Sequence, residues 1–318
     1  LAAGARPGTA RRHHVDSVPL LSLSLLSGYT ELTGQPIEFT TGDAGVLIQR
    51  LKTEGANTPA DMLITVDAGN LWHAAQNDVL STVDSSVLNN NIPAHLRDEG
   101  NQWFGLSLRA RTIVYSTQRV DPESLTTYED LATDKWQGRL CLRTSKKVYN
   151  QSLVAMLIAE HGEEKTEEIV KGWISNLATD VFSNDTKVVE AIVSGQCDLG
   201  VVNTYYFGRL ESTQPDIPAA LFWPNQGSTG VHVNVAGAGI TKHAKHPEQA
   251  QAFLEWLSQE EAQSMFAGEN REFPANPAVE SVPQVAAWGD FEASTLPLSK
   301  AGENQAAAVM LMDRSDYR

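Results

Sequence analysis

Short apolar runs alternate with segments of helical periodicity along most of this chain, and that alternation constrains the fold more than any other feature. The apolar runs predict strands at residues 61–66, 104–117, 138–143, 198–202, 220–223 and 231–240. Apolar residues three and four apart, often closed by a glycine, predict helices at residues 44–54, 71–77, 125–133, 151–160, 163–177, 185–194 and 247–258. The pattern is typical of an α/β protein with a mostly parallel sheet and helices on both faces.

The chain length and the strand ends indicate where a ligand would bind. A chain of 318 residues favours two domains, at roughly 150 residues each. Ligands of open α/β sheets bind beyond the carboxyl ends of the strands. Tyr149 and Asn150 come shortly after the predicted strand 138–143, and Asn203, Thr204, Tyr205 and Tyr206 come directly after strand 198–202.

Charge and hydropathy exclude several classes of partner. Lys plus Arg is 24 and Asp plus Glu is 39, so the net charge is −15, without a basic block. Such a chain is a poor candidate for nucleic acid or anionic lipid, and it contains no apolar run long enough to insert in a membrane. The stretch Val18–Leu26 follows Arg11 and Arg12, and we interpret it either as a remnant of a signal peptide or as part of an amphipathic first helix at 19–33.

Two cysteines, Cys141 and Cys197, are compatible with one disulfide or with two buried thiols, and their spacing fits no zinc motif. Each lies beside a predicted strand, which favours the disulfide because adjacent strands would bring them within bridging range.

Sequence motifs for catalysis are missing. The chain has no P-loop, no dinucleotide-binding glycine motif after a strand, no G-x-S-x-G and no H-E-x-x-H. This favours a binding protein over an enzyme.

Three tyrosines lie at the predicted strand ends: Tyr149, Tyr205 and Tyr206. A phenol is a poor ligand while protonated, but a hard trivalent cation such as Fe(III) can displace the proton. The alternative is that the three rings line a cleft for a sugar or an amine.

Several longer stretches carry a resemblance to a known family. They are PADMLITVDAGNLW (59–72), GLSLRARTIVYS (105–116), residues 125–162 with VYNQS, AIVSGQCDLGVVNTYYFGRL (191–210) and AWGDF (287–291). Together they resemble the periplasmic ferric-iron-binding proteins of iron ABC transporters, most closely the cyanobacterial subgroup. The combination of VYNQS with NTYY is the specific part.

The resemblance implies a type II-like, two-lobed periplasmic binding protein with the ligand cleft between its lobes. Lobe one would comprise residues 1–110 plus 228–318. Lobe two would comprise residues 111–227 and carry the tyrosines and both cysteines. The hinge would form where the chain crosses near 108–115 and 225–232.

The resemblance also implies a set of metal ligands. Tyr149, Tyr205 and Tyr206 match the family's tyrosine ligands. His13 and His14 take the places of a histidine and a tyrosine in a family motif that is nearest to Ala10–His14 here. A solvated turn is the alternative for the two histidines.

Arg109 and Arg111 lie on the predicted strand 104–117. Either could hold a synergistic anion or pair with a phenolate, a role for which we favour Arg111, or the two could simply form an exposed strand face.

The function implied by the resemblance is iron import. The protein would bind Fe(III), with or without a synergistic anion, and deliver it as a periplasmic monomer to an ABC permease with its ATPase, without catalysis. The alternative is a receptor of the same fold for an organic cation such as a polyamine or thiamine.

Overall fold

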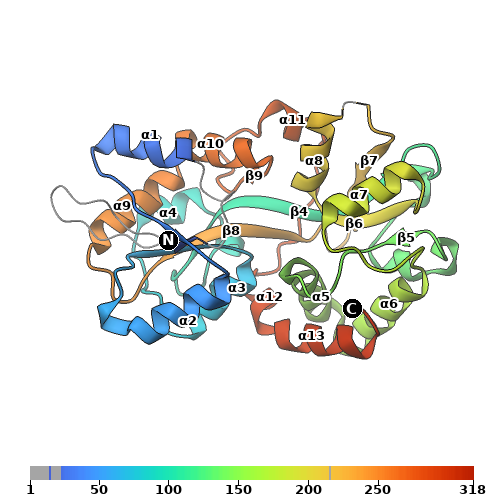
Figure 1. The fold of residues 1–318 in the computed structure, drawn as a ribbon, viewed down its shortest axis with the longest axis horizontal. Coiled ribbons are helices and arrows are strands. Elements are labelled where there is room, and N and C mark those ends of the chain that lie inside the picture. The colour runs from blue at the N-terminus through green and yellow to red at the C-terminus, as the bar shows by residue number, and fades with distance from the viewer. Residues whose placement is uncertain (1–13, 16–22, 215) are drawn as a thin grey trace. The chain divides into compact units, whose positions relative to one another are not determined.

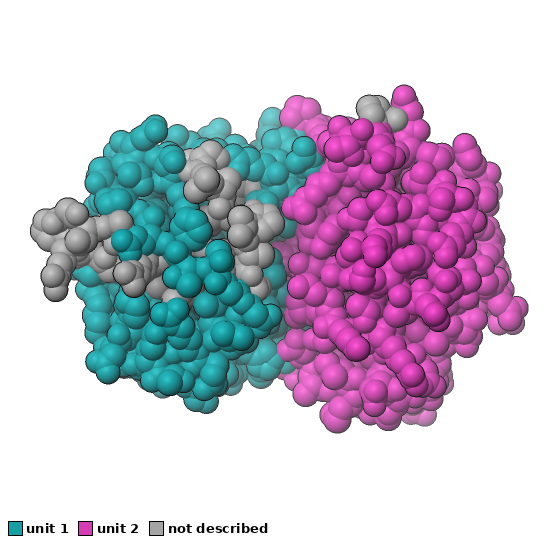
Figure 2. Space-filling view, in the orientation of Figure 1, with its two compact units in different colours: residues 1–108, 235–282, 297–302 teal, residues 109–234, 283–296, 303–318 magenta. Residues whose placement is uncertain are grey.

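A computed structural model describes residues 14–15, 23–214 and 216–318 of the chain. The chain divides into two compact units, coloured separately in Figure 2. Unit 1 comprises residues 1–108, 235–282 and 297–302, and unit 2 comprises residues 109–234, 283–296 and 303–318. The chain passes between the units within strand β4 (Phe104–Ser116) and within strand β8 (Val233–Ile240).

The C-terminal part differs from the expected division, which placed all of 228–318 in lobe one. Residues 283–296 and 303–318 belong to unit 2. The reason is that helix α13 (Gln305–Arg314) packs on α5 (Val148–His161) and α6 (Glu163–Ser175) and buries Leu311 and Met312 in the same apolar core.

Unit 1 is built on the strand order β2-β1-β3-β8. The first three strands run parallel, and β8 pairs antiparallel with β3. Their bounds are β1 His14–Val15, β2 Thr40–Thr41 and β3 Met62–Val66; the short β9, Phe273–Pro274, pairs antiparallel with β4.

The helices of unit 1 begin and end at residues that the chain supplies locally. In α2, Asp43 caps the first turn by accepting a hydrogen bond from the Gly45 amide (2.9 Å), and the helix ends at Gly55 with a positive φ of 50°. The helices are α1 Leu23–Thr33, α2 Ala44–Glu54, α3 Ala68–Gln76, α4 Ser86–Asn91, α9 Pro247–Leu257, α10 Glu260–Asn270 and, at the unit boundary, α12 Ser299–Glu303. Single 3₁₀ turns occur at Gly55–Asn57 and Ala94–Leu96.

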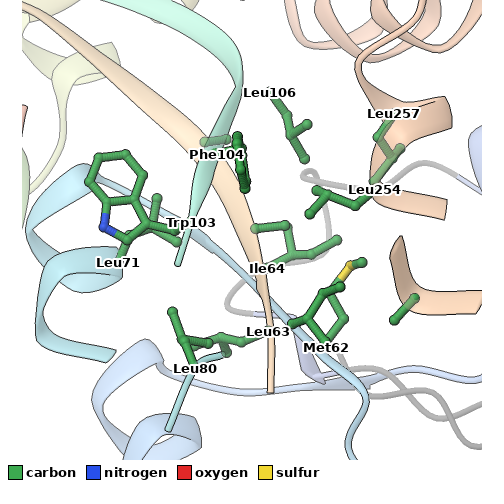
Figure 3. Close-up of a cluster of buried hydrophobic side chains, with 14 of the residues drawn as sticks. Met62, Leu63, Ile64, Leu71, Leu80, Trp103, Phe104, Leu106, Leu254 and Leu257 are labelled. Carbon is green, nitrogen blue, oxygen red and sulfur yellow. The ribbon is translucent and has the colours of Figure 1, made fainter. Parts of the chain in front are cut away.

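In Figure 1, α1, α9 and α10 lie on one side of the strands of unit 1, and α2 and α3 lie on the other. Figure 3 shows the apolar side chains of β3 packed among those of α3, β4 and α9. The buried residues labelled there are Met62, Leu63, Ile64, Leu71, Leu80, Trp103, Phe104, Leu106, Leu254 and Leu257.

Unit 2 is built on a second set of strands, in which β4 pairs antiparallel with β6 (Leu199–Asn203) on one side and with β7 (Ala219–Phe222) on the other. Strand β5 (Leu140–Cys141) continues the sheet by running parallel to β6. The sheets are therefore mixed, and the expectation of a mostly parallel sheet is wrong, because the long strands β4 and β8 return antiparallel to their neighbours.

The helices of unit 2 cover both sides of these strands, with α7 and α8 on one side and α5, α6 and α13 on the other (Figure 1). The remaining bounds are α7 Asp185–Ser194, α8 Thr204–Thr213 and α11 Pro283–Ala286. The helix expected at 125–133 is replaced by short 3₁₀ turns at Pro122–Ser124, Glu129–Ala132 and Asp134–Trp136.

The structure also bears on two further expectations, the pairing of the cysteines and the position of the first helix. Cys141 and Cys197 form a disulfide, with their Cα atoms 6.0 Å apart, which confirms the preferred alternative. The expected first helix at 19–33 corresponds to α1, whereas most of the Leu/Ser-rich segment before it lies outside the described residues. Among the described residues, no helix is both long and apolar enough to cross a membrane.

Candidate functional site

Tyr205 and Tyr206 lie in the first turn of α8, directly after the buried strand β6. Asn203 is the N-cap residue by backbone position, yet its side chain makes no capping hydrogen bond. Its amide nitrogen Nδ2 instead donates to the hydroxyl of Tyr205 (3.3 Å). The Asn203 side chain therefore contacts the tyrosine instead of capping the helix.

Tyr149 lies in the first turn of α5, which begins at Val148, earlier than the sequence predicted. The next residue, Asn150, holds the preceding loop by donating from Nδ2 to the carbonyl oxygens of Arg143 (2.9 Å) and Thr144 (3.0 Å). Both tyrosine-bearing helices thus begin beside the ends of neighbouring strands of unit 2, since β5 pairs with β6.

The three phenols form one cluster within unit 2. The rings of Tyr205 and Tyr206 have their centroids 4.4 Å apart, and the guanidinium group of Arg143 lies over the rings of both Tyr149 and Tyr206. Tyr149 and Tyr205 are only 8% and 7% exposed, whereas Tyr206 is half-buried. The structure therefore brings together all three tyrosines that the sequence singled out.

The charged groups over these rings are cationic. The guanidinium carbon of Arg143 lies 5.3 Å from the ring centroid of Tyr149 and 5.9 Å from that of Tyr206. Arg143 also donates to the Tyr206 hydroxyl (3.4 Å). In the described part of the chain, the other cations within 6 Å of a ring centroid in the cluster are Arg109, Lys147 and Arg209.

Burial raises the pKa of two of the three phenols, Tyr149 and Tyr205. It raises the pKa of Tyr149 to about 12, although the charge of Arg109 acts to lower it. Burial also raises the pKa of Tyr205 well above its ordinary value, and the neighbouring phenols Tyr149 and Tyr206 add to that rise. A ligand that requires phenolate must therefore displace protons from this cluster.

The two candidate arginines lie in unit 2 and differ in their surroundings. Arg109 is 1% exposed, and its guanidinium carbon is 5.9 Å from the ring centroid of Tyr149. Arg111 is 2% exposed and forms an ion pair with the buried carboxylate of Asp185 (3.0 Å). Neither residue lies on an exposed strand face, so that alternative is wrong.

The two histidines remain predictions. His13 lies outside the described residues, and His14 is described only as backbone in β1, opposite Thr40 and Leu63.

Sequence reasoning missed several residues of the cluster. Arg143 follows strand β5, so the rule that ligands bind beyond strand ends would have found it. Lys147 lies two residues before Tyr149, and Arg209 lies three residues after Tyr206. Closeness in sequence to a tyrosine is a weaker signal than a position at a strand end. Asp185 begins α7, far from every tyrosine in sequence, and no local pattern marks it.

The fold and the site define the class of this protein. The chain belongs to the family of bacterial extracellular solute-binding proteins, which matches residues 25–293. Together with the relatives and solved structures that follow, this confirms the predicted fold class and the predicted resemblance.

Individual relatives are more specific. The chain is 42% identical over 300 residues to the iron uptake protein A1 of Synechocystis, covering 92% of this chain and 83% of the relative. Iron uptake protein A2 of the same organism is also 42% identical, over 89% of this chain and 84% of the relative.

Solved structures agree with these relatives. The Trichodesmium protein IdiA (FutA) in complex with iron and citrate superposes with a TM-score of 0.92 at 39% identity, covering 96% of this chain and all of that one. The ferric binding protein of Campylobacter jejuni gives a TM-score of 0.88 at 33% identity, with 96% and 99% coverage. These relatives are thus named for iron uptake, for a complex with iron and citrate, and for ferric binding.

Proposed function

We propose that this protein binds Fe(III) through the phenolate oxygens of Tyr149, Tyr205 and Tyr206 for iron uptake. The observation that carries the proposal is the cluster itself: three phenols come from two helices more than fifty residues apart in sequence, two of their rings lie 4.4 Å apart between centroids, and one guanidinium group lies over the rings of Tyr149 and Tyr206. The relatives named for iron uptake and ferric binding support it.

The charge balance favours a trivalent ion. Three phenolates carry three negative charges, which one Fe(III) neutralises, and hard oxygen donors suit this ion better than copper or zinc. Metal binding drives the deprotonation of its ligands, so the raised pKa values of Tyr149 and Tyr205 do not prevent ligation.

An anion is the proposed companion of the ion. Four cationic side chains lie within 6 Å of the ring centroids, namely Arg109, Arg143, Lys147 and Arg209. Once iron neutralises the phenolates, the excess positive charge attracts an anion, and the complex of the Trichodesmium protein with iron and citrate supports such a partner. We assign Arg109 as the candidate for this contact. The participation of His13 and His14, and an ion held between two lobes, remain predictions.

Delivery is the second half of the proposal. Members of this family are substrate-binding proteins, and we propose that the loaded protein delivers iron to an ABC permease with its ATPase in the periplasm, as a monomer and without catalysis.

The same charges argue against an organic cation. A site for a polyamine or thiamine needs aromatic rings flanked by carboxylates. The rings of this cluster are flanked by arginines and a lysine, and the buried carboxylate of Asp185 is paired with Arg111.

Ferric titration of metal-free protein tests the proposal. Phenolate coordination is expected to give an intense visible charge-transfer band that saturates at one iron per chain. Tyr205→Phe should weaken the band and reduce affinity by at least the ~10–100-fold that is typical for disturbing a metal site. Tyr115→Phe is the matched control, because Tyr115 lies on β4 and packs against a separate apolar core. A wild-type protein that stays colourless with ferric salt, with and without citrate, would exclude tyrosine ligation.

A further inference from the structure

Arg111 uses every hydrogen-bond donor of its guanidinium group inside the protein. Nε donates to Oδ1 of Asn150 (2.9 Å). One terminal nitrogen donates to Asp185 (3.0 Å) and to Oδ1 of Asn203 (3.0 Å). The other donates to Asp185 (3.4 Å) and to the Val201 carbonyl (3.3 Å). A guanidinium has five N–H groups, so no donor of Arg111 is left for a bound anion.

Two of these acceptors are adjacent to the tyrosine ligands. Asn150 follows Tyr149 directly in α5, and its own Nδ2 holds the loop that precedes this helix. Asn203 ends β6, two residues before Tyr205, and the other end of its amide donates to the Tyr205 hydroxyl. Arg111 therefore joins the two segments that supply the phenols.

Asp185 completes the arrangement from a third element. It is fully buried at the start of α7, and its Oδ2 accepts from Arg111 and from the backbone amide of Asn203 (3.0 Å). The Asp185 carboxylate thus holds the guanidinium group of Arg111 and also the backbone at Asn203, where β6 ends and α8 begins. Because Arg111 occupies Oδ1 of Asn203, the side-chain amide can present only its Nδ2 to Tyr205.

We propose that Arg111 is a positioning residue for the tyrosine cluster, acting through Asn150 and Asn203, and that it does not bind the anion. The inference rests on the proposed function and refines it, since it separates the roles of the two arginines on β4. Arg109 remains the candidate anion contact, whereas Arg111 sets the geometry of the phenols before a ligand arrives.

The test uses Arg111→Lys, which keeps the charge beside Asp185 but offers three donors in place of five. Asn203→Leu is the second variant, because it removes the link to Tyr205 without unpairing the Arg111–Asp185 ion pair. Arg119→Lys is the matched control, since Arg119 pairs with Asp198 in the same unit (2.7 Å) and contacts none of the three tyrosines in the described hydrogen bonds.

Two readouts separate this inference from the proposed function. In metal-free protein, phenol ionisation followed at 295 nm should begin at higher pH in Asn203→Leu, because the donor that stabilises the Tyr205 phenolate is lost, and should differ from wild type in Arg111→Lys, while Arg119→Lys should match wild type. With iron loaded, both variants should shift the charge-transfer band and release iron to a chelator roughly 10–100-fold faster, with the response to added citrate retained.

Each outcome has a distinct meaning. If the phenol titration changes but wild type gives no iron band, the proposed function fails while the positioning role stands. If the titration and the band of both variants equal those of wild type, the positioning role is overturned. It is equally overturned if Arg111→Lys changes only the response to citrate, because that result would identify Arg111 as an anion ligand.

Discussion

The rings of Tyr205 and Tyr206 lie 4.4 Å apart between centroids, at an interplanar angle of 32°, although the two residues are neighbours in one helical turn. Neighbouring side chains of a helix ordinarily point about 100° apart. Here the strand β6 runs directly into the helix, and the first turn places both rings beside Arg209, whose guanidinium carbon is 4.9 Å from one centroid and 5.9 Å from the other. The pair thus presents two oxygen donors from consecutive residues.

Iron binding is expected to release one proton for each ligating phenol, because burial keeps Tyr149 (pKa about 12) and Tyr205 protonated at pH 7. Calorimetric titrations with one ferric chelate in buffers of different ionisation enthalpy measure this number. Tyr149→Phe should release one proton fewer per bound iron than wild type, and Tyr115→Phe should release the same number. Equal proton release by wild type and Tyr149→Phe would contradict ligation by Tyr149.

Removing the disulfide is expected to lower stability without changing the tyrosine site. Cys141 and Cys197 are 56 residues apart, and the chain-entropy relation gives about 4 kcal/mol for closing such a loop. A variant with both cysteines replaced by alanine should lose about 2–4 kcal/mol of unfolding free energy in urea denaturation.

The same disulfide variant should keep its iron affinity within about threefold, because neither cysteine contacts a phenol of the cluster in the described structure. The control is wild type treated with a thiol reductant, which should approach the stability of the variant. Reduced and oxidised wild type with the same denaturation midpoint would contradict the stabilising role.

His232 is expected to destabilise the folded protein in acid. Burial, with the charges of Arg111 and Arg109, lowers its pKa to about 3, whereas an unfolded histidine titrates near ~6.5. Between these values the unfolded chain binds a proton that the folded chain does not, so the free energy of unfolding falls as pH drops below about 6.5. At pH 5 this difference is about 2 kcal/mol.

Thermal or urea unfolding from pH 7.5 to 5 measures the effect. His232→Leu should lose less stability than wild type over this range, by about 2 kcal/mol. Comparing the two proteins at each pH cancels the contribution of the carboxylates. Parallel stability curves for the two proteins would show that His232 is not held neutral.

Gly200 has no room for a side chain, although it lies within the regular strand β6. A Cβ atom there would come within 2.6 Å of Val188 Cγ1 and 2.7 Å of the Cys141 carbonyl oxygen. Gly200→Ala is therefore expected to cost about 1–3 kcal/mol of unfolding free energy. Because Gly200 lies on β6, the variant should also weaken iron binding by displacing the strand that leads to Tyr205.

Gly28→Ala is the control for that substitution. Among the described residues, a Cβ atom at Gly28 would meet only Met265, at 3.7 Å, and alanine favours the helix by up to about 1 kcal/mol. This variant should be as stable as wild type or more so. Equal stability of Gly200→Ala and wild type would show that α7 and β5 can move away from β6 at little cost.

Local patterns in the sequence accounted for the elements that carry the site. The periodicity of Ala44, Leu47, Ile48 and Leu51 predicts α2, with Gly55 as its end. The run GQCDLGVVNTYY predicts a buried strand that leads straight into the tyrosines, and β6 and α8 agree with it. Such features depend on residues close together in the chain, and local conformational preferences are sufficient to encode them.

The amino-acid sequence by itself thus determined the alternation of elements, the two cysteines beside strands, and the three tyrosines as the chemical signal. The tertiary structure alone decided that β4 and β8 run antiparallel to their neighbours, that α13 belongs to unit 2, and that Arg111 is paired with Asp185. Arg111 and Asp185 are 74 residues apart, and their contact exists only because β4 and α7 are packed around the same strand, β6. Pairings at such separation depend on how the whole chain buries its apolar surface, and no short segment carries that information.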